Sequence, residues 1–295
     1  MDGIPLGPSY AWKQARDSGV TRRQIAAAGV PLARGLYLSR AVDLDLDLAA
    51  RCAAWATVLP ADAVFGLQTA TALFGVAHDP GEEEPLHVVL TPRRVLPQHT
   101  GLVVHARRMR SEDVVAHRGL RVTSGAQTYL DMAAVLRPRD LLALGDALMR
   151  AGVLDRPALC ARLARAERVR GVIAARAWAP RLDGRAGSHR ESWLRYWLLT
   201  SDLPEPQVQV PLLDRWGREV AHADLGYERW KVGLEYEGRQ HAAPEQFDRD
   251  LDRYSLAAVD GWLTLRFAAR HGESAVVDRT RRALLSRGWR PGQPS

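Results

Sequence analysis

Two glutamates stand two positions apart in a segment that otherwise has the composition of a buried β-strand. The segment, WKVGLEYEG, runs from Trp230 to Gly238. Because successive side chains on a strand point to opposite faces, Glu235 and Glu237 share one face at a separation of roughly 7 Å. Two carboxylates at that spacing repel each other and resist burial unless a cation lies between them. The spacing therefore predicts a metal site.

Two more polar residues lie close to this pair along the chain. Asp224 is near the end of a segment that alternates polar and apolar residues, and His241 follows soon after Gly238, which permits a sharp exit from the strand. The stretch from Ala223 to His241 thus gathers four titratable side chains among strand-like segments: Asp224, Glu235, Glu237 and His241.

Each of these residues also has a simpler explanation. The two glutamates would be harmless on an exposed edge strand. Asp224 would then be a turn residue at a strand end, and His241 a solvated loop residue. A central strand is favoured by the apolar residues of the same segment: Trp230, Val232, Leu234 and Tyr236.

Composition and charge limit the class of protein. The 295 residues are enough for two domains, and 46% hydrophobic with 25% charged residues is typical of a globular protein. The net charge of +7 comes almost wholly from arginine, since only Lys13 and Lys231 are lysine. Arginine binds phosphate through a bidentate fork, so the charge favours a polyanionic partner, although a general bias toward Arg and Ala explains it equally well.

Other features predict a cytoplasmic protein. No apolar segment is long enough to cross a bilayer, so no membrane association is expected, and the N-terminal residues lack the pattern of a secretory signal. Cys52 and Cys160 lie far apart in Ala/Leu-rich helical contexts. We expect both to be free thiols in the core, in a reducing compartment.

The elements that position the acidic residues form a C-terminal domain, 188–290. Its boundary is placed in the Pro/Gly-rich segment PRLDGRAG, which ends at Gly187. A capping box, Ser188 to Glu191, opens the first helix. The periodicity then predicts the order α-β-β-β-α-β-α, with strands at 207–213, 219–225, 230–236 and 262–267 and later helices at 245–259 and 276–287.

The rest of the chain is predicted as two regions. Residues 41–180 form a mixed α+β region, with helices at 48–59, 60–76, 124–136, 139–151 and 156–166 and strands at 86–91 and 101–106. Ser124 opens a capping box for the helix at 124–136, and Asp155 is the N-cap of the helix at 156–166. In residues 1–40, Thr21 is a helix N-cap and Gly29 a stop. The segment Arg34-Gly35-Leu36-Tyr37, and the later helix 60–76, resemble AbiEi-type antitoxins. Too few residues follow Gly29 for a full recognition helix, which leaves a degenerate winged-helix segment or a small packing subdomain.

The C-terminal order and residues resemble the PD-(D/E)XK, or restriction-endonuclease-like, nuclease superfamily. The likeness is greatest to the branch around very-short-patch repair endonucleases. It covers about a third of the chain and is carried by these matches: Glu191, Asp224-Leu225, Glu235-Tyr236-Glu237-Gly238 with His241, Asp250 with Arg253, and Gly261-Trp262. Position 237 carries Glu where the branch usually has Asp, one methylene shorter.

This resemblance implies a restriction-endonuclease-like α-β-β-β-α-β core and a Mg²⁺-dependent DNA endonuclease. One or two Mg²⁺ ions, with Mn²⁺ as the alternative, neutralise the phosphate and activate water. Asp224 and Glu235 are the first choice as oxygen ligands. Glu237 occupies the position that holds lysine in most of the superfamily, so it would be a further ligand or orient water. His241 would act as general acid or base, or hold a phosphate when protonated.

Three further residues complete the expected site. Glu191 would reach a second metal position from the first helix, but its place in the capping box explains it equally well. Arg239 and Arg253 are candidates for contacts with the nucleic acid. Arg253 lies three residues after Asp250, so the two form a helix salt bridge in the simpler interpretation.

Two classes of function follow from these residues. The first is an endonuclease, in DNA repair or in defence against foreign DNA. The second is a non-catalytic, antitoxin-like DNA-binding regulator with an inactive nuclease fold. The first is favoured because a decayed site should have lost its acids, whereas Asp224, Glu235 and Glu237 are present. In a third and weaker interpretation, the front half is a protein-interaction module. The resemblance leaves open a toxin or a methylase as partner.

Overall fold

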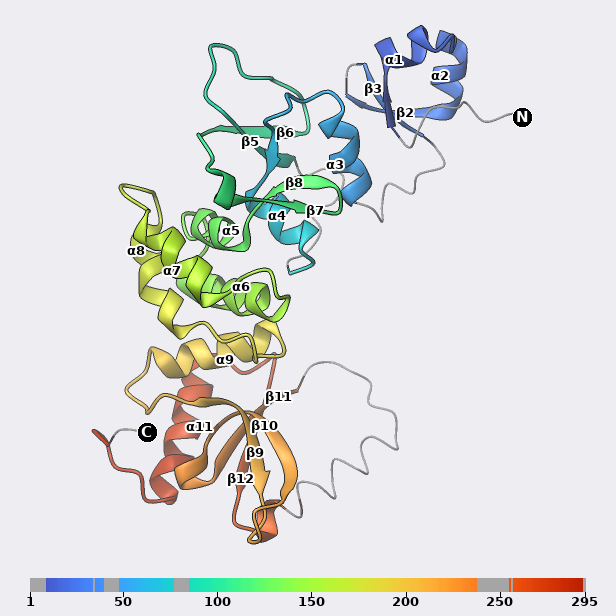
Figure 1. The fold of residues 1–295 in the computed structure, drawn as a ribbon. Helices are drawn as coiled ribbons and strands as arrows, with labels where there is room; N and C mark the ends of the chain where they lie inside the picture. Colours follow the sequence, from blue (N-terminus) through green and yellow to red (C-terminus); the bar gives the residue numbers. More distant parts are fainter. Residues whose placement is uncertain are drawn as a thin grey trace. The chain divides into compact units, whose positions relative to one another are not determined.

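The computed structural model describes residues 9–33, 35–39, 48–76, 85–237, 255 and 257–293. The chain divides into two compact units (Figure 1). The first comprises Met1–Val135 and Ala151–Arg176, and the second comprises Leu136–Arg150 and Ala177–Ser295. Within the described ranges, no helix is both long and apolar enough to cross a bilayer.

The first unit begins with a three-stranded antiparallel sheet and two short helices. Its elements are β1 (Ser9–Ala11), α1 (Trp12–Asp17), α2 (Arg22–Ala28), β2 (Gly29–Ala33) and β3 (Leu36–Ser39), with strand order β1-β3-β2. Thr21 caps α2 in a capping box with Gln24, and Gly29 is its C-cap, as predicted. Tyr10, Ala15 and Ile25 form the small core beneath the helices.

A five-stranded sheet forms the rest of the first unit's core. Its elements are α3 (Leu48–Ala56), β4 (Val64–Phe65), α4 (Leu67–Leu73), β5 (Leu86–Leu90), β6 (Leu102–Ala106), β7 (Val114–His117) and β8 (Leu120–Thr123), in strand order β6-β5-β4-β8-β7. The prediction of a single helix at 60–76 is wrong. Its first part, β4, pairs with β5 on one side and β8 on the other, so only the part after Gly66 is helical.

Helices follow the sheet, namely α5 (Gly125–Met132), α7 (Arg156–Ala164) and α8 (Val172–Trp178). Ser124 and Asp155 cap α5 and α7 as predicted. Both cysteines are free thiols, with Cys52 buried and Cys160 exposed. The prediction that Cys160 lies in the core is wrong, because α7 buries the face that carries Leu159 and Leu163.

The second unit is built on a four-stranded mixed sheet. Its elements are α6 (Pro138–Arg150), α9 (His189–Leu199), β9 (Gln207–Leu213), β10 (Glu219–Tyr227), β11 (Val232–Glu237), β12 (Leu263–Ala268) and α11 (Glu273–Ser286). The strand order is β12-β11-β10-β9. Strand β10 pairs antiparallel with both β9 and β11, and β12 runs parallel to β11. The predicted helix 245–259 lies mostly outside the described residues, but Ala257–Val259 are helical.

The outer half of the β9–β10 hairpin folds back onto its own sheet. Val208 and Leu225 pack in the core under α9 and α11, whereas Val210 and Ala223, each two residues away, pack with Ala257 and Trp262. Regular alternation would keep residues two apart on one face. The side chains therefore change from one face of the sheet to the other between these residues, at Gln209 and Asp224. Gln209 has a left-handed φ of 56°.

Two glycines allow this close approach. A Cβ at Gly233 would lie 3.1 Å from the Cβ of Ala223, and a Cβ at Gly226 would lie 3.2 Å from the side chain of Val210. The indole N–H of Trp262 donates to the carbonyl of Leu213, 3.0 Å away, which fixes the folded-back end. Asp224 thus lies at a sharp corner of the sheet.

The division into units differs from the predicted regions 1–40, 41–180 and 188–290. Helix α6 belongs with the second unit, because its Asp146 is buried against α9. The Asp146 carboxylate accepts hydrogen bonds from the Ser192 hydroxyl at 2.7 Å, from Arg195 Nη2 at 2.6 Å and from the Asp183 N–H at 2.7 Å. This network ties α6 to the helix that carries Glu191.

Candidate active site

Asp224 lies where the ladder between β10 and β11 ends. The last pair of that ladder is Leu225 with Leu234, so Asp224 and Glu235 occupy the next position on neighbouring strands. The Asp224 side chain continues the connection, because its Oδ2 accepts the backbone N–H of Tyr236 at 2.7 Å. The pairing of β10 with β11 therefore places side by side the two residues that the sequence predicts as metal ligands.

β11 is an internal strand of the sheet, with β10 on one side and β12 on the other. The interpretation of Glu235 and Glu237 as acids on an exposed edge strand is therefore wrong. Glu235 is partly buried and lies opposite Arg266 in the parallel register with β12.

Glu191 approaches the same corner from the first turn of α9. Its N–H donates to the N-cap hydroxyl of Ser188 at 3.2 Å, and its Oε2 accepts the N–H of Gly187 at 2.7 Å. The capping role expected for Glu191 is thus present. The carboxylate also accepts a hydrogen bond of 3.4 Å from the side-chain amide of Gln209, the residue opposite Asp224 on β9.

The environment of Asp224 disfavours its charge. Burial, the largest cause, raises the pKa of its carboxyl group to about 6. The negative charge of Glu191 raises this pKa further, while the hydrogen bond from Tyr236 and the nearby His222 lower it. His222 lies 3.1 Å from the carboxylate of Glu219. Asp224 and Glu191 are therefore close enough for their negative charges to interact.

Glu237 forms an ion pair with an arginine of the neighbouring strand. It lies at the exposed end of β11, and its Oε1 is 3.1 Å from Nη1 of Arg266. An arginine on β12 therefore offsets the charge of Glu237.

Within the ranges described above, no three His, Cys, Asp or Glu side chains form a group that could hold a metal ion. His241, Arg239, Asp250 and Arg253 lie outside those ranges. Glu191, Asp224 and Glu235 are the expected site residues that the structure places at one corner of the sheet.

Sequence reasoning missed Gln209. In the segment QVQVPLL, Gln207 and Gln209 alternate with apolar residues and have the pattern of a solvent-facing strand edge. The available signal was the hairpin register, which places Gln209 opposite Asp224 once the turn at Asp214–Gly217 is fixed. The uncharged side-chain amide of Gln209 thus lies beside the Glu191 carboxylate.

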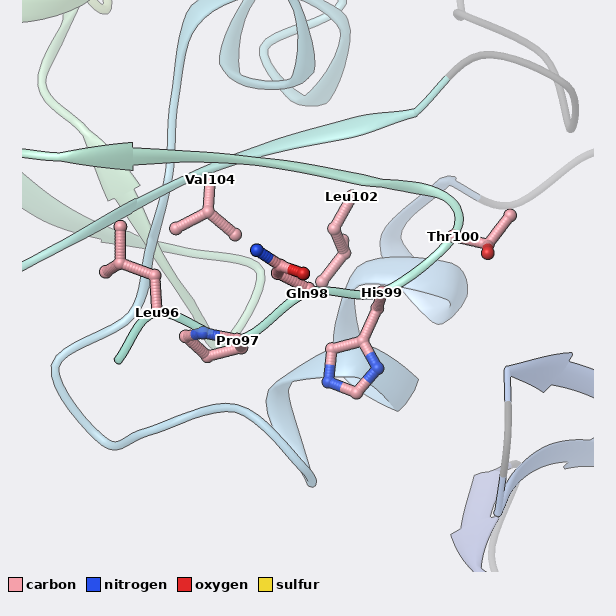
Figure 2. Close-up of a pocket in the computed structure, with 7 residues that line it drawn as sticks. All are labelled: Leu96, Pro97, Gln98, His99, Thr100, Leu102 and Val104. Carbon is pink, nitrogen blue, oxygen red and sulfur yellow. The ribbon is translucent and has the colours of Figure 1, made fainter. Parts of the chain in front are cut away.

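A separate surface hollow of about 440 Å³ lies in the first unit, in the loop between β5 and β6 (Figure 2). It is lined by Leu96, Pro97, Gln98, His99, Thr100, Leu102 and Val104. The ring of His99 packs against Trp55, with 5.3 Å between ring centroids. The lining carries no carboxylate, so the hollow shares no chemistry with the acidic corner.

Comparison with known proteins identifies relatives. No family model matches the sequence. Uncharacterized protein Rv2248 of Mycobacterium tuberculosis (strain ATCC 25618 / H37Rv) and uncharacterized protein MT2308 of strain CDC 1551 / Oshkosh are each 32% identical to it over 229 residues, which cover 77% of this chain and 81% of each relative. The crystal structure of the RV2827C protein from Mycobacterium tuberculosis is similar over 62% of this chain and 74% of that chain, at 13% identity, but its TM-score of 0.41 is too low to support an argument about the fold. The extent and identity of the first two matches show that this chain belongs to the family of the Mycobacterium tuberculosis protein Rv2248.

Proposed function

We propose that this protein is a Mg²⁺-dependent endonuclease that hydrolyses phosphodiester bonds in DNA. One observation carries the proposal: Asp224 and Glu235 occupy adjacent positions on neighbouring strands at the corner that Glu191 approaches. The buried Asp224 carboxylate beside the negative charge of Glu191 is unfavourable by itself, and a bound cation would offset that cost.

The donor set fits a hard divalent cation. Asp224 and Glu235 would hold Mg²⁺, or Mn²⁺ in its place, because both ions prefer carboxylate oxygen. When bound, the ion supplies neutralising charge to the scissile phosphate and lowers the pKa of water. Tyr236 fixes one oxygen of Asp224, and Glu191 is held by Gly187 and Gln209, so the chain itself orients these acids.

The strand topology supports a restriction-endonuclease-like core. In that superfamily the first acid is on the second strand and the other acidic motif on the third, and here Asp224 is on β10 and Glu235 on β11. His241 remains the proposed acid or base, and Arg239 and Arg253 remain proposed contacts to DNA.

A second candidate is a DNA-binding regulator without catalysis. The ion pair between Glu237 and Arg266 favours it, because it occupies the side chain that would otherwise orient water or bind metal. Both the endonuclease and the regulator are proposed to act in DNA repair or in defence against foreign DNA. Either could have a toxin or a methylase as partner.

Plasmid nicking separates the two functions. Purified protein should cleave in Mg²⁺ or Mn²⁺ but not in EDTA, on supercoiled, mismatched, methylated or single-stranded DNA. Asp224→Asn and Glu235→Gln should each lower the rate by roughly 10²-fold or more, because each removes a charged metal ligand. Glu219→Gln is the matched control, since Glu219 is an exposed acid on β10 that contacts His222. Absence of metal-dependent cleavage on every DNA form would favour the regulator, and unchanged rates in both site variants would reject the site.

A further inference from the structure

A second group of charged side chains lies on α6 and α9, apart from the carboxylate corner formed by Glu191, Asp224 and Glu235. At its centre is the indole of Trp193. The guanidinium carbon of Arg139 is 3.6 Å from the Trp193 ring centroid, and that of Arg190 is 4.4 Å from it. The imidazole of His189 meets the same indole edge-on, with 5.2 Å between centroids.

One carboxylate lies within this cationic group. Asp140 Oδ1 is 3.4 Å from Arg139 Nε and 3.9 Å from His189 Nε2. Among the residues that the structure describes, Asp140 is the one carboxylate paired with this group, and it cannot offset two guanidinium charges, so the group keeps a positive charge. The side chains are accessible, with 30% exposure for Arg139 and 50% for His189, and Arg190 is exposed.

Stacking leaves the arginines suited to bind an anion. A guanidinium that lies over an aromatic face uses its π surface there, while its N–H groups point outward in the plane. Those N–H groups match the oxygens of a phosphate in a bidentate arrangement, which is stronger than a neutral hydrogen bond. Held by one rigid indole, the two arginines lose less conformational entropy on binding than two free side chains would.

A purely structural role explains only part of this arrangement. One arginine stacked on Trp193 would suffice to cover the ring, whereas a second brings a like charge close to the first at an energetic cost. An anion near both would remove that repulsion. The first turn of α9, on which His189 and Arg190 lie, adds the partial positive charge of a helix start.

We propose that Arg139, Arg190 and His189 form a binding site for a phosphodiester group of nucleic acid. The site deepens the proposed function and rests on it for the identity of the polyanion. Glu191, at the carboxylate corner, directly follows Arg190 in the first turn of α9. A nucleic-acid strand bound at this site would therefore pass close to Glu191 and the carboxylates near it.

Binding measured in EDTA tests this proposal without any cleavage. Fluorescence anisotropy would follow a labelled 20-base-pair DNA duplex with the full-length protein. Arg190→Gln and Arg139→Gln should each weaken binding about tenfold, as expected for loss of a charge-assisted contact. Each should also lower the slope of log affinity against log salt by about one. Arg190→Lys should recover only part of the loss, because lysine cannot make the fork.

Arg287→Gln provides a matched control. Arg287 is an exposed arginine at the end of α11, so its removal changes net charge equally in the same unit. Binding of this control should stay within about twofold of wild type. Circular dichroism and melting temperature show whether Arg139→Gln remains folded, and Arg190→Gln tests the site alone if it does not.

The outcomes also distinguish this site from the catalytic proposal. Losses in the arginine variants no larger than in Arg287→Gln would overturn the inference, even if metal-dependent cleavage is found. Losses specific to Arg139 and Arg190 would support it, even if no DNA is cleaved and the proposed catalysis fails. Calorimetric titration with inorganic phosphate gives a second arm. Arginine-dependent binding of phosphate with unchanged binding of DNA would assign the site to free phosphate groups and overturn the nucleic-acid assignment.

Discussion

At the level of single residues, Asp224 opposes folding when it is ionised. Burial raises the pKa of its carboxyl group to about 6, and Glu191 contributes in the same direction. An aspartate in an unfolded chain has a pKa of about 3.9. The folded state therefore holds the Asp224 proton more tightly than the unfolded state does, so stability falls as pH rises from about 4 through about 6. Such a cost is expected of residues kept for function.

Asp224→Asn should be more stable than the wild-type protein at pH 8, by on the order of 2–3 kcal/mol. Asparagine keeps an oxygen that can accept the Tyr236 N–H but carries no charge. Urea unfolding at several pH values measures the difference, which should shrink to nearly zero by about pH 3.5. A variant that is less stable at pH 8, or a difference that does not change with pH, would contradict the raised pKa of Asp224.

At the level of elements, α9 holds the site residues in place through its buried face. Asp146 of α6 is fully buried, and Arg195 of α9 is 4% exposed. Their carboxylate and guanidinium groups meet at 2.6 Å, and Ser192 adds a hydrogen bond to the same carboxylate. Arg190 and Glu191 lie on the same helix, so α6 supports both the phosphate site and the acidic corner.

Asp146→Ala should destabilise the second unit by about 3–5 kcal/mol, because it leaves the charge of Arg195 buried without its partner. Thermal and urea unfolding measure this loss. Glu205→Gln removes an exposed acid that pairs with Arg181, and it should cost less than about 1 kcal/mol. Equal effects of the two substitutions would show that the Asp146 network does not hold α9.

At the level of the whole molecule, neither unit is a continuous piece of chain. The chain leaves the first unit after Val135 to form α6 in the second, and it returns at Ala151. Composition places a boundary where proline and glycine gather, at 180–187, and cannot reveal this excursion. The contact that ties α6 to the second unit joins Asp146 to Arg195, which are 49 residues apart in the chain. Aspartate and arginine are mostly exposed in proteins, so their residue types do not predict that they are buried here.

The features that the sequence predicted correctly are those that local residue patterns determine. The caps at Thr21, Ser124 and Asp155, and the strands of the second unit, follow from residue type and alternation. The fold-back of the β9–β10 hairpin was not predictable in this way. It depends on a left-handed Gln209 and on close packing over Gly226 and Gly233, which only the three-dimensional register reveals. The strands that carry Asp224 and Glu235 were predicted, whereas the nearness of Asp224 to Glu191 was not.

We propose that the carboxylates at the corner of the second unit's sheet hold a divalent cation. Calorimetric titration of the metal-free protein with Mn²⁺ tests it directly, in the wild type, in Asp224→Asn and in Glu235→Gln, with Glu219→Gln as control. We predict saturable binding in the wild type and the control, and affinity at least about tenfold lower in both site variants. Equal affinity in all four proteins, or no binding to the wild type at millimolar Mn²⁺, would contradict it.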